Sequence, residues 1–114
     1  MKKLLLFIMC AAAVFFSRAA ASADQFEQGK HLYSEKCVIC HGAQGNGEGP
    51  AGLAFSPHPT NFTTSGFWER KDIDRFIATT IREGHGPMPS FALSSEEIQA
   101  ITDYMTRTFK PGTK

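Results

Sequence analysis

The segment Cys37-Val38-Ile39-Cys40-His41 contains the side chains of this sequence that are best suited to carry out chemistry. Two thiols one helical turn apart can add across the two vinyl groups of a haem, and an imidazole directly behind them can reach the iron from the same side. This C-x-x-C-H pattern is the signature of covalent haem attachment. We therefore predict one haem c, bound through thioethers to Cys37 and Cys40, with His41 as the proximal iron ligand.

Other uses of the cysteine pair fit the sequence less well. A redox dithiol of the thioredoxin type needs a strand–helix–strand context, and the sequence offers none. A zinc site needs two further ligands at suitable spacing. The other histidines, which form no second close pair, are His31, His58 and His85. A disulfide between cysteines three positions apart would close a very short loop and stabilise the fold little.

The second axial ligand is predicted to be Met88, which lies in the segment Gly86-Pro87-Met88-Pro89. Two prolines stiffen this loop, so it can hold a thioether in place. A thioether opposite an imidazole raises the reduction potential relative to two imidazoles. Met105 falls at core spacing on an expected helix, where methionine usually packs. The alternatives at the iron are His85 in the same loop and an open or exchangeable position.

The first 23 residues have the pattern of a signal peptide. A positive start is followed by an uncharged run over residues 4–16, and Ala21-Ser22-Ala23 fits cleavage before Asp24. The run is short for crossing the hydrocarbon core of a membrane, although an uncleaved N-terminal anchor is the alternative. We predict that residues 24–114 form a periplasmic domain, without stable membrane insertion once the peptide is removed.

The charge of this domain excludes one large class of partners. Three of the 12 Lys and Arg lie in the predicted signal peptide, so nine remain against 11 Asp and Glu, a net charge of −2. Nucleic-acid binding needs a basic footprint, which this balance does not supply. The length suffices for one domain with a small core that a buried cofactor would help to complete.

Hydrophobic periodicity predicts an all-α domain. The helices are expected over residues 24–36, 72–83 and 95–109. Glycines and prolines between residues 42 and 64 forbid a long regular element there, and prolines also mark residues 85–91 as a loop. Ser94 and Glu97 have the spacing of a capping box at the start of the last helix.

Together these features resemble the class I cytochrome c family over nearly all of the predicted domain. In that family, a glycine and an aromatic residue before the haem motif pack against an apolar and an aromatic residue in the last helix. Here these positions are Gly29, Tyr33, Ile101 and Tyr104. The segment Met88-Pro89-Ser90-Phe91 is similar to the family's Met-Pro-x-Phe loop. The resemblance implies the class I fold, in which the N- and C-terminal helices cross and loops enclose the haem.

Two further site residues follow from the resemblance alone. In the family, a proline carbonyl accepts the Nδ1 hydrogen of the proximal histidine, and such a bond orients the ring. Pro59 is favoured for this role over Pro57 and Pro50. Trp68 resembles family aromatics that pack on haem or donate to a propionate, with a plain core tryptophan as the alternative.

The resemblance and the ligand set together indicate an electron carrier rather than an enzyme. With both axial positions filled, no substrate needs to bind the metal. One electron would pass between redox-partner proteins that dock briefly at an exposed haem edge. The alternatives are a cytochrome subunit of a larger redox enzyme complex and a ligand-binding or sensing haem protein, from whose iron Met88 would have to dissociate.

Overall fold

The computed structural model describes the backbone of residues 1–113 and the side chains of residues 1–3 and 20–113. The regular elements of this part of the chain are all helices. β pairing within it is limited to one isolated bridge between His85 and Met88. The elements are α1 (Lys2–Lys36), α2 (Val38–His41), the 3₁₀ helix η1 (Gly52–Ala54), α3 (Ser65–Trp68), α4 (Ile73–Glu83) and α5 (Ser95–Phe109). The predicted all-α fold class is confirmed.

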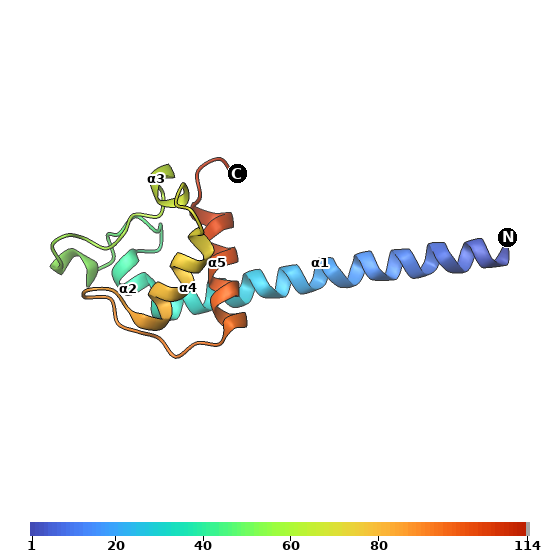
Figure 1. The fold of residues 1–114 in the computed structure, drawn as a ribbon, viewed down its shortest axis with the longest axis horizontal. Helices are drawn as coiled ribbons and strands as arrows, with labels where there is room; N and C mark the ends of the chain where they lie inside the picture. Colours follow the sequence, from blue (N-terminus) through green and yellow to red (C-terminus); the bar gives the residue numbers. More distant parts are fainter. Residues whose placement is uncertain (114) are drawn as a thin grey trace.

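The long helix α1 has two parts with different surroundings. Its N-terminal part projects away from the rest of the molecule, whereas its C-terminal part, which includes the predicted helix over 24–36, lies against the other helices (Figure 1). Among the residues that the structure describes, no helix combines the length and the apolar character needed to span a membrane.

Helices α1 and α5 pack against each other at Gly29, as the resemblance implied. A Cβ atom placed on Gly29 would overlap the backbone carbonyl of Ala100 and would lie 3.0 Å from the Cβ of Tyr104. The rings of Tyr33 and Tyr104 are 5.4 Å apart at their centroids, and Ile101 is 1% exposed. Only glycine permits this close approach of the two helix backbones, so the predicted crossing is confirmed.

Replacing Gly29 with alanine is expected to destabilise the protein. Alanine is the better helix former by about 1 kcal/mol, but overpacking a fixed backbone costs ~1–3 kcal/mol and occasionally more. The cost of overpacking exceeds the gain in helix propensity, because the added Cβ would meet the backbone carbonyl of Ala100 rather than a flexible side chain. Thermal and denaturant unfolding measure the loss. Gly66→Ala is the matched control, since nothing lies within 4 Å of its added Cβ; equal stability of the two variants would contradict the close crossing.

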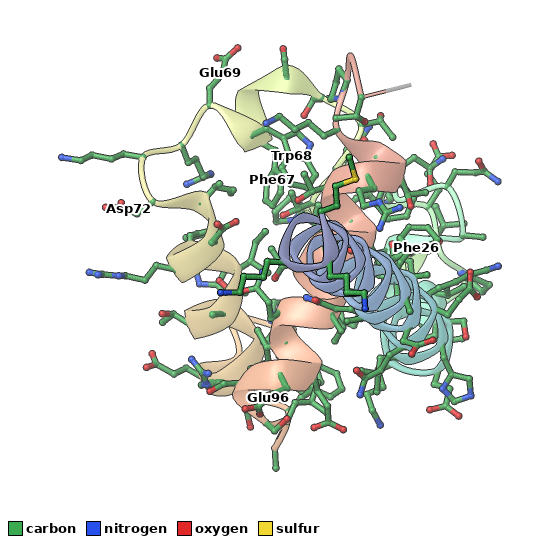
Figure 2. The ribbon with its side chains drawn as sticks, turned by 90° about the vertical axis from the view of Figure 1, so that its right-hand side faces the viewer. Phe26, Phe67, Trp68, Glu69, Asp72 and Glu96 are labelled. Atoms are coloured by element: carbon green, nitrogen blue, oxygen red, sulfur yellow. The ribbon has the colours of Figure 1, made fainter. Side chains whose placement is uncertain are left out.

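The last helix begins where its capping box predicts. The Ser94 hydroxyl accepts a hydrogen bond from the Glu97 N–H at 3.1 Å, and the Glu97 carboxylate accepts one from the Ser94 N–H at 2.8 Å. From this start α5 presents an apolar face to the core, and it ends at Phe109. A view along α1 shows Phe67 and Trp68 on the inner side of α3, whereas Glu96 at the start of α5 points outward (Figure 2).

Candidate haem site

The haem motif forms a helical turn of its own directly after α1. The chain departs from regular helix at Cys37, where φ is −113°, and resumes as α2. Within this turn the His41 N–H donates to the Cys37 carbonyl at 2.8 Å. Cys37 and Cys40 are free thiols, each half-buried. The structure therefore places both thiols and the imidazole on one turn, as C-x-x-C-H chemistry requires.

The glycine-rich loop that follows folds back onto the motif and fixes its backbone. The carbonyls of Ile39, Cys40 and His41 accept hydrogen bonds from the N–H groups of Ala51, Gly49 and Gly47, at 2.9, 3.0 and 2.8 Å respectively. A Cβ atom on Gly52 would overlap the Cys40 carbonyl oxygen. The loop can approach these carbonyls closely because glycines stand at two of the three donors and at Gly52.

Tyr33 connects the crossing of α1 and α5 to the turn that carries the haem motif. Its hydroxyl donates to the carbonyl of Gly42 at 3.0 Å, and Gly42 directly follows His41. Burial raises the pKa of Tyr33, with smaller contributions from Cys37 and Tyr104. The phenol therefore stays protonated, and it remains a donor over the physiological pH range.

The ring of His41 is oriented by the carbonyl of Thr60, which lies 3.2 Å from Nδ1. The acceptor predicted at Pro59 thus lies one residue later. The Pro59 carbonyl is turned toward Gly47, and the Pro59 ring lies beside Gly52, so this proline supports the loop instead of the imidazole. Burial lowers the pKa of His41, and the bond to Thr60 offsets part of that effect. The imidazole is therefore neutral near pH 7, the form that binds metals.

The protonation of Cys37 argues against a redox dithiol. Burial raises the pKa of its thiol to about 11; Lys36 opposes this increase and Cys40 adds to it. Reactive C-x-x-C pairs have a thiol pKa that is lowered below the usual value. The thiol of Cys37 is therefore poorly suited to thiol–disulfide exchange.

Met88 lies in a tightly closed loop between α4 and α5. The N–H and carbonyl of Met88 bond to the carbonyl and N–H of His85, both at 3.0 Å, and the Phe91 N–H fastens the loop to the Ile81 carbonyl at 2.8 Å. The Met88 side chain is half-buried and packs against the core, whereas His85 is exposed. Met105 is 4% exposed within the core itself, as expected for a packing methionine.

Trp68 is buried among the core residues, and its predicted contact with the haem stays a prediction. Its indole N–H donates to the carbonyl of Phe62 at 2.7 Å, and its ring meets Phe67 edge-on at 5.0 Å. A tryptophan has one side-chain donor, and here that donor is used by the main chain. A donation from Trp68 to a propionate would require this bond to Phe62 to break.

Sequence reasoning missed Phe62 altogether. Its ring stacks on that of His41, with centroids 4.6 Å apart and an interplanar angle of 21°. No spacing rule links Phe62 to the motif, because the two residues are joined through a long irregular loop. Phe62 lies two residues after Thr60, but this position predicts a contact with His41 only when the path of the loop is known.

The residues around the motif fit a haem. Ile39 in α2, Leu53 in η1 and Phe55 just after it are 55%, 56% and 37% exposed, and α2 and η1 contact each other. Large apolar side chains that gather at the surface commonly mark a binding site. Two thiols and a neutral imidazole on one helical turn, with exposed apolar side chains beside them, are a donor set suited to covalent haem binding.

Comparison with known proteins agrees with this site. Residues 24–105 match the model of the family described as cytochrome c oxidase, cbb3-type, subunit III. No curated protein and no solved structure matches the chain. The matched residues include the whole motif and the Met88 loop.

Proposed function

Because this chain belongs to the cbb3-type cytochrome c oxidase subunit III family and is therefore a haem c electron-transfer cytochrome, we propose that it is a periplasmic carrier of single electrons. The observation that supports this proposal best is the single helical turn that presents Cys37, Cys40 and His41 together. These are the two cysteines of residues 24–114, so we propose one haem per chain.

In this proposal each site residue has a defined task. Cys37 and Cys40 would hold the haem through thioethers, and His41 would be the proximal ligand. The Nδ1–H of His41 donates to Thr60, and this contact fixes the ring and raises its basicity. Met88 would be the distal ligand. The bound haem supplies a ferric/ferrous couple, and methionine opposite histidine raises its potential.

We also propose that the exposed side chains of Ile39, Leu53 and Phe55 contribute to docking with redox partners. Ile39 lies within the haem motif, and Leu53 lies in η1, which contacts α2. Encounters of this kind use small interfaces and dissociate readily. The proposed transfer would not require any of these residues to move a proton.

Export to the periplasm is proposed from the signal-peptide pattern. Cleavage before Asp24 would remove the part of α1 that projects away from the molecule (Figure 1) and would leave the part that contains Gly29 and Tyr33. Cytochrome c domains are generally extracytoplasmic, and the family match begins at residue 24, in agreement with this boundary.

The test is to express the full chain in a host that matures c-type haem and to characterise the product. We expect a periplasmic protein that begins at Asp24 and carries one haem that survives acid–acetone extraction. Replacing both Cys37 and Cys40 with alanine should abolish the covalent haem. A product without covalent haem would overturn the proposal.

A second function, as a subunit of a larger redox enzyme, is favoured by the description of the family itself. Affinity purification of the tagged protein from membranes of its native host distinguishes the two. Stoichiometric recovery of a catalytic subunit would favour the complex. A soluble haem protein recovered alone would favour the free carrier.

A further inference from the structure

We propose that Phe62 is a positioning residue that fixes the plane of the His41 imidazole. This inference rests on the proposed function, in which His41 binds the haem iron. It assigns to Phe62 a role in the electronic symmetry of the iron site, separate from ligation as such.

The argument begins with the two contacts made by the His41 ring. The hydrogen bond from Nδ1 to the Thr60 carbonyl, at 3.2 Å, fixes one direction within the ring plane. It leaves the ring free to turn about that direction. The face of Phe62, stacked at 4.6 Å and 21°, fixes the direction perpendicular to the plane. Together the two contacts remove the rotational freedom of the imidazole.

Phe62 can act in this way because its own position is fixed at both backbone polar atoms. Its N–H donates to the Gly45 carbonyl at 2.7 Å. Its carbonyl accepts the indole N–H of Trp68, also at 2.7 Å. Trp68 thus acts on the site through its hydrogen bond to the backbone of Phe62.

The ring of Phe62 is supported on its other sides by aromatic neighbours. Phe67 packs against it at 5.0 Å, and Phe109 lies stacked with it at 6.3 Å. Phe62 is 6% exposed. A ring enclosed in this way cannot move aside, so it acts as a firm support for the imidazole of His41.

The plane of an axial imidazole determines which iron d orbital overlaps with the imidazole π system. That overlap sets the g anisotropy of the ferric iron and the distribution of unpaired spin over the four haem methyl groups. Loss of the Phe62 face should therefore change both properties, even where His41 and Met88 remain ligands.

The test compares the ferric holoprotein of Phe62→Leu with that of Ile98→Ala. Both residues are buried, at 6% and 3% exposed, and belong to the same core cluster, but Ile98 lies near the start of α5, at the opposite end of that helix from Phe109. We expect Phe62→Leu to change the g values and the order or spread of the haem methyl NMR signals. Ile98→Ala should lower the thermal midpoint and keep the wild-type spectra.

Trp68→Phe is a second variant that keeps an aromatic ring and removes the bond to the Phe62 carbonyl. Trp68→Phe should shift the spectra in the same direction as Phe62→Leu, but by a smaller amount. If Phe62→Leu does not fold, Trp68→Phe alone tests whether Phe62 positions the His41 ring. Wild-type spectra in Phe62→Leu and Trp68→Phe would overturn the inference, as would an equal shift in Ile98→Ala. Failure of the wild-type protein to attach haem would instead reject the proposed function.

Discussion

Replacing Met88 with alanine is expected to lower the reduction potential of the holoprotein by on the order of a few tenths of a volt. Axial ligands set haem potentials over a range of about 0.8 V, and methionine opposite histidine lies toward the upper part of that range. Without the thioether, water or another donor would take the position and favour the ferric state. Redox titration monitored by the visible spectrum measures the shift.

Met105→Ala is the matched control for that experiment. Met105 is 4% exposed in the core, so its truncation should cost ~2–5 kcal/mol of stability and leave the potential nearly unchanged. The reduced Met88→Ala protein should also bind carbon monoxide at neutral pH, whereas the wild-type protein should not. An unchanged potential in Met88→Ala would show that Met88 is not the ligand, and ready binding by the wild type would favour a ligand-binding haem protein.

The second large effect is expected at Gly52. A Cβ there would overlap the Cys40 carbonyl oxygen, which also accepts the Gly49 N–H. Overpacking costs ~1–3 kcal/mol in general, and here the displaced backbone carries one of the two haem thiols. We expect Gly52→Ala to reduce strongly the fraction of chains that carry covalent haem, as measured by mass spectrometry of periplasmic extracts.

Gly66→Ala provides the control, because its added Cβ meets nothing within 4 Å. It should mature with haem as the wild type does. Full haem loading of Gly52→Ala would contradict the view that the loop must lie directly against the motif.

The elements that the sequence predicted well are those that depend on local patterns. The last helix was bounded at Ser95 and Phe109 because a capping box and a steady apolar stripe mark it. Helix α4 begins one residue later than predicted, since Asp72 adopts a left-handed backbone with φ of 56°. The turn α3 escaped prediction because four residues are too few to give a periodic signal.

The contacts around His41 could not be predicted, since they depend on the path of a long irregular loop. The resemblance to class I cytochromes c implied a proline carbonyl as the acceptor for the imidazole, but it could not show which carbonyl faces the ring. The structure places Thr60 there and turns Pro59 toward Gly47. In the same way, the bond between Trp68 and Phe62 joins residues whose partnership no periodicity reveals.

The central claim is that a single haem c, held by Cys37, Cys40 and His41, is closed on its other face by Met88. Proton NMR of the reduced holoprotein tests it most directly, because the haem ring current shifts the signals of a coordinated methionine far upfield. We predict that these signals are present in the wild type and in Met105→Ala and absent in Met88→Ala. Their absence in the wild type, or their persistence in Met88→Ala, would contradict the claim.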